Sequence, residues 1–123
     1  MHRTLSALVL AALLGCGGSG SNGSGNDPAG NTSDPVAACK NLFTTLCNKL
    51  FECNPTQAGQ AYGSASACAT SLSGGCSTTG TSCPSGKSYS ASNASACINA
   101  YAGESCTDVN NEVTPASCNQ ICQ

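Results

Sequence analysis

The sequence contains few of the side chains from which cores, charged surfaces and active sites are usually built. Its 123 residues include no tryptophan, two phenylalanines and three tyrosines, and only 8% of them are charged. The one histidine is His2, at the extreme N-terminus. The low charge excludes a basic nucleic-acid-binding surface. The lack of histidine after residue 2 excludes Ser-His and Cys-His catalytic pairs from the rest of the chain.

No hydrophobic run is long enough to cross a membrane. The longest one without a charge, Leu5 to Leu14, has ten residues, whereas a spanning helix needs about 20. It follows the positive head formed by Met1, His2 and Arg3, which is the pattern of a secretory signal peptide. We therefore predict a signal peptide over residues 1–15.

The run ends in "LLGC", residues 13–16, which resembles the bacterial lipobox. Leu13, Gly15 and Cys16 match that motif, and Leu14 is a less usual residue at its position. The resemblance implies cleavage between Gly15 and Cys16, and transfer of acyl chains to Cys16. Each buried methylene contributes about 0.8 kcal/mol of membrane affinity, so two or three chains would hold the protein firmly.

The stretch after Cys16 is poor in apolar side chains. Residues 17–34, "GGSGSNGSGNDPAGNTSD", include no large apolar residue and are expected to bury nothing. As a flexible coil they would span roughly 24 Å root-mean-square. We predict that residues 16–34 are the lipidated cysteine and its linker, and that residues 35–123 form the folded domain. After loss of residues 1–15, three lysines and six carboxylates leave a formal charge of −3, which selects no partner.

In contrast to the aromatic and charged residues, cysteine is abundant, with 11 residues. This density in a short chain is typical of a disulfide scaffold made in an oxidising compartment. If Cys16 carries lipid, an even number remains, and we predict that these form five disulfides that compensate for a small core. The ten are Cys39, Cys47, Cys53, Cys68, Cys76, Cys83, Cys97, Cys106, Cys118 and Cys122.

Helix geometry restricts the pairing without determining it. Cys39 and Cys47 are eight residues apart on one predicted helix, about 12 Å, which is too far for a bridge. Cys118 and Cys122 are expected to reach different neighbouring elements. Cys68 is expected to pair with Cys47 or Cys53.

The periodicity of apolar residues predicts a small, disulfide-rich all-α bundle of about four short helices. The first begins at Pro35, with Asp34 as N-cap, and ends at Asn54-Pro55. The others are predicted over residues 64–73, 93–102 and 115–122. Residues 64–76 and 93–106 share the sequence A-S-A-C followed by a later Gly and Cys. They predict either two helical hairpins or one cysteine-bearing helix used twice, unless the similarity is due to chance.

Four kinds of functional site are conceivable and none is favoured. No Cys-x-x-Cys occurs, so neither a metal site nor a cofactor is expected. The loop "GTSCPSGKS", residues 80–88, has its glycines one residue too far apart for a phosphate-binding loop. Glu104, Asp108 and Glu112 stand four residues apart and could do acid–base chemistry, but such a cluster is usually a solvated surface. A cavity for an apolar ligand would compete with the core for the few large apolar residues.

Four stretches of the domain resemble a known group of proteins. They are "LCNKLFECNP", "YGSASAC", "SASNASACINAYAGESC" and "TPASC", and they are similar in sequence and spacing to Cys-rich lipoproteins of myxobacteria. The resemblance covers about 77 residues, and Cys39, Cys83 and Cys122 are additions to its pattern. It implies a lipid-anchored, disulfide-bonded envelope protein and no particular activity.

The sequence thus predicts a lipoprotein anchored through Cys16 at the bacterial outer membrane or cell surface. We expect a structural or binding role without catalytic activity, toward an envelope or extracellular protein or a polysaccharide. The alternatives are an extracytoplasmic carrier of lipid or another small ligand and, less favoured, a carboxylate-dependent hydrolase.

Overall fold

The computed structural model describes residues 29–123. The predicted signal peptide, Gly15, Cys16 and the linker up to residue 28 lie outside the described residues. Helices make up 64% of the described chain, which has no strand beyond a single bridge between Tyr89 and Cys122. The predicted all-α class is therefore confirmed.

The central element is the helix α1, Pro35–Cys53. It begins as predicted, because the Asp34 carboxylate accepts a hydrogen bond from the Val36 backbone N–H at 3.0 Å. Pro35 occupies the first helical turn, where no backbone donor is needed. The helix ends at Asn54, also as predicted.

Asn54-Pro55 not only stops α1 but also starts a second helix that was not predicted. This helix, α2, covers Pro55–Tyr62 and has Pro55 in its first turn. A proline that cannot continue one helix is well suited to begin another, because the first turn leaves its N–H groups unpaired anyway. Gly63, with a φ of 79°, then ends α2.

Two of the remaining predicted helices are present with shifted ends. The helix α3 covers Ala65–Leu72, is capped by the Ser64 hydroxyl, and continues into the 3₁₀ turn η1, Ser73–Gly75. The helix α4 covers Ala91–Gly103 and begins earlier than predicted, because the Ser90 hydroxyl caps it by accepting from the Asn93 N–H.

The C-terminal part differs most from the prediction. A short helix, α5, covers Cys106–Asn110 and was missed, since a single turn is too short to show a hydrophobic period. The predicted α-helix over 115–122 is instead the 3₁₀ helix η2, Ala116–Gln120. With five α-helices and two 3₁₀ segments, the described chain has more helical pieces than the four predicted.

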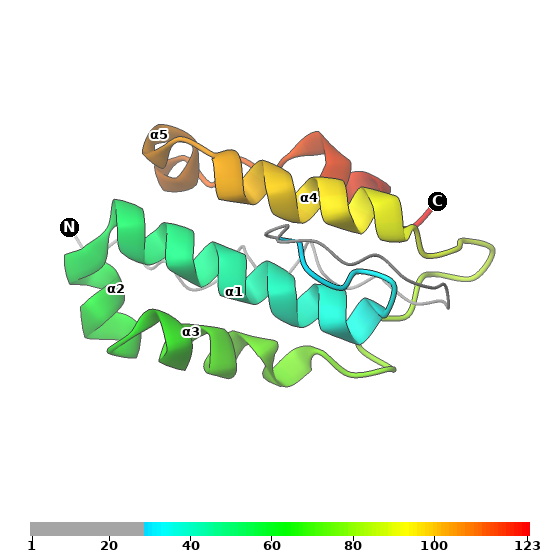
Figure 1. Ribbon diagram of the computed structural model, residues 1–123, viewed down its shortest axis with the longest axis horizontal. Coiled ribbons are helices and arrows are strands. Elements are labelled where there is room, and N and C mark those ends of the chain that lie inside the picture. Colours follow the sequence, from blue (N-terminus) through cyan, green and yellow to red (C-terminus); the bar gives the residue numbers. More distant parts are fainter. Residues whose placement is uncertain (1–28) are drawn as a thin grey trace.

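The helices form layers with α1 in the middle (Figure 1). The helix α3 lies along one side of α1 and runs in the opposite direction, whereas α4 lies along the other side and runs in the same direction. Both helices pack directly on α1, and η2 packs on α4. The main core lies between α1 and α4 and consists of Ala29, Ala38, Leu42, Ala94, Cys97, Ile98 and Ile121.

Residues 29–33 belong to this folded unit, although the sequence predicted them to be part of the linker. Ala29 is fully buried, and its carbonyl accepts a hydrogen bond from Asn41 Nδ2 at 2.9 Å. The Thr32 carbonyl accepts from the Tyr89 hydroxyl at 2.6 Å. The prediction that this stretch buries nothing is wrong, because a methyl group and backbone carbonyls are enough to dock it where two helices meet.

Candidate functional site

All ten cysteines of the described chain form disulfides, with S–S distances from 2.00 to 2.06 Å. Cys68 pairs with Cys47, which is one of its two predicted partners. Cys118 and Cys122 reach different elements, as predicted. The pairs are Cys39–Cys76, Cys47–Cys68, Cys53–Cys106, Cys83–Cys122 and Cys97–Cys118.

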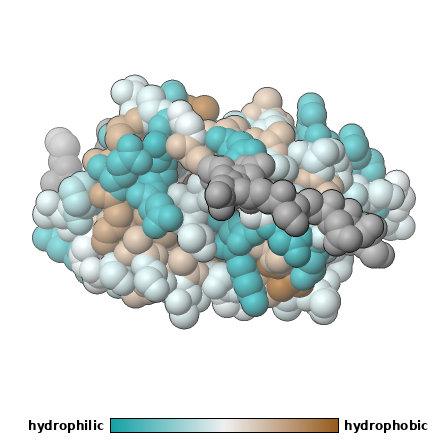
Figure 2. All heavy atoms as spheres, viewed as in Figure 1, coloured by the Kyte–Doolittle hydropathy of each residue, from teal (hydrophilic) through white to brown (hydrophobic). Residues whose placement is uncertain are grey.

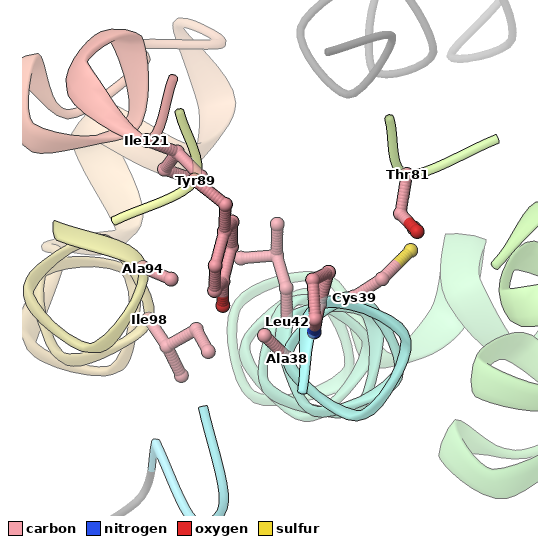
Figure 3. Close-up of a pocket in the computed structure, with 9 residues that line it drawn as sticks. Ala38, Cys39, Leu42, Thr81, Tyr89, Ala94, Ile98 and Ile121 are labelled. Carbon is pink, nitrogen blue, oxygen red and sulfur yellow. The ribbon is translucent and has the colours of Figure 1, made fainter. Parts of the chain in front are cut away.

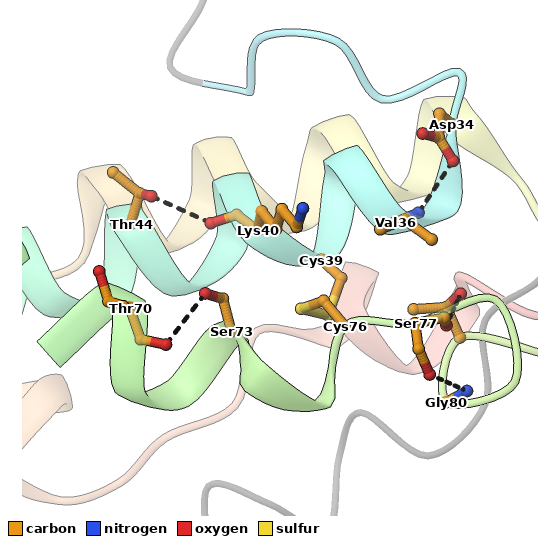
Figure 4. Close-up of a disulfide and its surroundings, with 11 residues drawn as sticks. Asp34, Val36, Cys39, Lys40, Thr44, Thr70, Ser73, Cys76, Ser77 and Gly80 are labelled. Carbon is orange, nitrogen blue, oxygen red and sulfur yellow. Dashed lines mark hydrogen bonds between the residues drawn. A yellow bond between two sulfur atoms is a disulfide. The ribbon is translucent and has the colours of Figure 1, made fainter.

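Two of these disulfides hold α3 and η1 against α1 in one register. Cys39 and Cys47 are eight residues apart on α1, and so are their partners Cys68 and Cys76 on the chain that runs back along it. Figure 4 shows Cys39 and Cys76 meeting where α1 starts and η1 ends. Because the helices are antiparallel, equal spacing on both chains places each cysteine opposite its partner.

Each of the two similar segments of the sequence forms a helix, α3 and α4, and the two helices have different disulfide partners. The A-S-A-C cysteine of α3, Cys68, bonds to α1, whereas that of α4, Cys97, bonds to Cys118 of η2. The cysteines that follow, Cys76 and Cys106, both bond to α1.

A polar groove of about 250 Å³ lies along α1 and ends near α4. We call it the polar groove, and its lining residues are Asn41, Thr44, Thr45, Asn48, Lys49, Glu52 and Ala102. The Lys49 ammonium and the Glu52 carboxylate are 3.1 Å apart, so the lining has no net charge. Amide and hydroxyl groups in a concave, neutral surface suit a hydrogen-bonding partner.

The polar groove was not predicted, since its shape depends on how α1 and α4 pack. Its polar residues recur at three- and four-residue steps, a signal that indicates only an exposed helix face. Figure 2 shows one face of the molecule, on which hydrophilic and hydrophobic areas are interspersed among residues of intermediate hydropathy. Val113 is the most exposed of the large hydrophobic residues in the described chain, at 47%.

Of the three candidate acidic residues, Glu104 and Asp108 interact. Burial raises the pKa of the Glu104 carboxyl, the negative charge of Asp108 raises it further, and Lys49 opposes both effects. Asp108 accepts a hydrogen bond from the Ser105 hydroxyl at 2.6 Å in the cap of α5. Glu112 lies in the turn that follows α5.

Tyr101 lies near Glu104 of this pair. Burial raises the pKa of its hydroxyl, the Thr114 side chain lowers it through a hydrogen bond, and Glu104 raises it. The Asp108 carboxylate accepts from Ser105, the N-cap residue of α5, and the Glu112 backbone N–H donates to the Val109 carbonyl at the end of α5.

The interior between α1 and α4 contains a cavity of only about 20 Å³ (Figure 3). Ala38 and Leu42 line it from α1, and Ala94 and Ile98 line it from α4. A cavity of this size holds one water molecule at most and is far smaller than the pocket of a lipid or cofactor.

The glycine-containing loop over residues 80–88 forms an ordinary turn. The Lys87 N–H donates to the Pro84 carbonyl at 3.0 Å, with Gly86 at a φ of 83°. This geometry is that of a β-turn that needs glycine at its third position. Cys83 ties the loop to Cys122 near the C-terminus.

Over residues 29–123 no group of three or more His, Cys, Asp or Glu side chains is arranged to hold a metal ion. In the same part of the chain, no helix combines the length and the hydropathy needed to cross a bilayer.

Comparison with known proteins found no relative. No protein-family model, no curated protein and no solved structure matches this chain.

Proposed function

We propose that this chain is a cell-envelope lipoprotein, anchored in the membrane through Cys16, whose disulfide-bonded domain has a structural or binding role outside the cytoplasm. The observation that carries the proposal is the complete pairing of the ten cysteines between residues 39 and 122. Because these ten cysteines are bonded to one another, none of them is left to pair with Cys16, the eleventh.

Two features of the chain account for that odd cysteine. Cys16 follows a ten-residue apolar run with only Gly15 in between, and Leu13 and Gly15 precede it as in a lipobox. Five disulfides in a domain of this size are also typical of proteins that fold in an oxidising compartment. Both features support a location at the bacterial outer membrane or cell surface.

The polar groove supports a binding role for the domain. Its neutral amide and hydroxyl groups fit a polysaccharide or the polar surface of an envelope or extracellular protein. The cavity of about 20 Å³ does not favour the alternative of a lipid or small-ligand carrier. A carboxylate-dependent hydrolase is favoured even less, because Asp108 is engaged in the cap of α5.

Intact mass measurement of the chain isolated from bacterial membranes tests the proposal. We expect a chain that begins at Cys16, carries acyl groups, and gains no alkyl groups before reduction and ten after it. The Cys16→Ser variant is the control and should lack acyl mass and leave the membrane fraction. A chain without acyl mass, or one with thiols that alkylate without reduction, would overturn the proposal.

A further inference from the structure

The disulfides divide the domain into two separately bonded halves. We call α1 with α3 and η1 the first half, held together by Cys39–Cys76 and Cys47–Cys68. The second half consists of residues 83–90, α4, η2 and the C-terminal residues, held together by Cys97–Cys118 and Cys83–Cys122. Only the fifth disulfide, Cys53–Cys106, joins α1 to the chain that follows α4.

This fifth disulfide holds one end of the contact between the halves, whereas at the other end no disulfide joins them, only the backbone of residues 77–82 between Cys76 and Cys83. Cys53 is the last residue of α1, and Cys106 comes shortly after the end of α4. Because α1 and α4 run in the same direction, their first turns meet at the opposite end (Figure 1). At that end the small cavity separates Pro35 and Ala38 of α1 from Tyr89 and Ala94 (Figure 3).

Residues 29–33 cross the contact at this second end, and we call them the strap. The Ala29 carbonyl accepts from Asn41 Nδ2 of the first half at 2.9 Å. The Thr32 carbonyl accepts from the Tyr89 hydroxyl of the second half at 2.6 Å. The Ala29 methyl group is fully buried in the core shared by α1 and α4. The strap therefore holds both halves at once.

We propose that the strap is a releasable closure, and that its detachment lets the two halves separate about Cys53–Cys106 as far as the backbone of residues 77–82 allows. Helices of this length depend on tertiary packing for stability. Detachment weakens the packing of α4 on α1, while α3 stays bonded to α1 by two disulfides. If the anchor proposed for Cys16 holds, the strap is the first described segment between the membrane and the domain. A pull on the linker then acts on the strap before it acts on α1.

Two substitutions detach the strap from opposite sides. Asn41→Ala removes the donor to the Ala29 carbonyl and also the weaker one to the Asn31 carbonyl, at 3.3 Å. Gly30→Ala places a Cβ 2.9 Å from Asn41 Nδ2, at a φ of 56° that a side chain disfavours. Asn48→Ala on the same helix and Gly74→Ala, whose Cβ would meet nothing within 4 Å, are the matched controls.

Hydrogen exchange of the full, oxidised chain, followed by mass spectrometry, measures the effect. In both strap variants we expect amides of α4 to exchange about tenfold faster, the size expected from the loss of one or two hydrogen bonds. Amides of α3 should change less than about twofold, because its two disulfides remain. Neither control substitution should change the exchange rates of the amides in α3 or α4.

Equal acceleration of α3 and α4 would overturn the proposal, since the strap would then contribute only to global stability. Unchanged exchange in both variants would overturn it as well. The acyl mass of the same sample reports on Cys16 separately. Its absence would contradict the proposed anchor and leave the result on the strap intact.

Discussion

Glu112 is the one described residue other than glycine with a positive φ, at 55°. It ends α5, where the N–H of Glu112 donates to the Val109 carbonyl and that of Val113 donates to the Asp108 carbonyl. This hydrogen-bond pattern places Glu112 at the position where helix ends favour glycine. A side chain costs roughly 1 kcal/mol in this conformation.

We therefore expect Glu112→Gly to raise the free energy of unfolding by up to about 1 kcal/mol. Urea denaturation at neutral pH measures the change. Glu112→Gln is the control, since it removes the charge and keeps the side chain, and it should leave stability unchanged. An equal gain in both variants would show that charge, not backbone conformation, is the cause.

Glu104 gives the stability of the domain a pH dependence of known sign. Its pKa is raised above the ordinary 4.5, chiefly by burial and then by Asp108. The folded state therefore binds the proton more tightly than the unfolded state does. The contribution of Glu104 to the free energy of unfolding falls as the pH rises from 4.5 through the folded pKa.

Glu104→Gln should consequently stabilise the domain at pH 7 and lose this advantage near pH 4. Urea denaturation of the variant and the parent chain at both pH values tests the expectation. Glu52→Gln, which removes an exposed carboxylate from the ion pair with the largely buried Lys49 side chain, serves as a comparison. If the Glu104→Gln variant is less stable than the parent chain at pH 7, the attraction of Lys49 outweighs burial.

At the scale of elements, the register of α1 against α3 depends on two disulfides of unequal burial. Cys47 and Cys68 are 1% and 0% exposed, whereas Cys39 is only partly buried. The Cys39–Cys76 bridge closes the longer loop, with a separation of 37 residues against 21. Through loop entropy alone, the disulfide that closes the longer loop should stabilise the fold by only about 0.5 kcal/mol more than the other. The loss of buried packing around two cysteines costs more than that.

We expect Cys47→Ala/Cys68→Ala to lower the free energy of unfolding by about 3–5 kcal/mol. Cys39→Ala/Cys76→Ala should lower it by about 2–4 kcal/mol. Denaturant titration of the two double variants in parallel provides the comparison. The reverse order would mean that loop closure, not packing, dominates the stability of this helix pair.

The elements also show what the sequence could predict. The start of α1 was predictable because Asp34 and Pro35 act on the adjacent backbone. The helix α5, with 5 residues, was missed because it is too short for a hydrophobic period. The helix α2 was missed because Asn54-Pro55 was interpreted only as the end of α1 and not as the start of another helix. The 3₁₀ form of η2 was missed too, since α and 3₁₀ turns share the same short-range signals.

For the whole molecule, the sequence predicted the number of disulfides and not their connectivity. An even count follows from composition once Cys16 is set aside. The partner of each cysteine depends on which helices pack and in which direction, and neither is local information. The polar groove and the docking of Ala29 were missed for the same reason, because both depend on α4 lying beside α1.

The connectivity predicts the order in which the whole molecule loses its disulfides. Cys106 is exposed and Cys53 is partly buried, whereas Cys47, Cys68 and Cys97 are at most 1% exposed. Attack on a disulfide requires access to a sulfur atom. Reduction should therefore begin at Cys53–Cys106, which alone joins α1 to the chain after α4.

Limited reduction with a neutral water-soluble phosphine, followed by alkylation and peptide mass mapping, measures this order. A neutral reagent avoids repulsion by Glu104 and Asp108, which are close to Cys106 in sequence. The first species to accumulate should carry alkyl groups on Cys53 and Cys106 and keep its helical circular dichroism, since each half retains two disulfides. Early alkylation of Cys47 or Cys97 would mean that the halves unfold before their exposed link is reduced. The described domain would then be a single cooperative unit, not two bonded halves joined by a link.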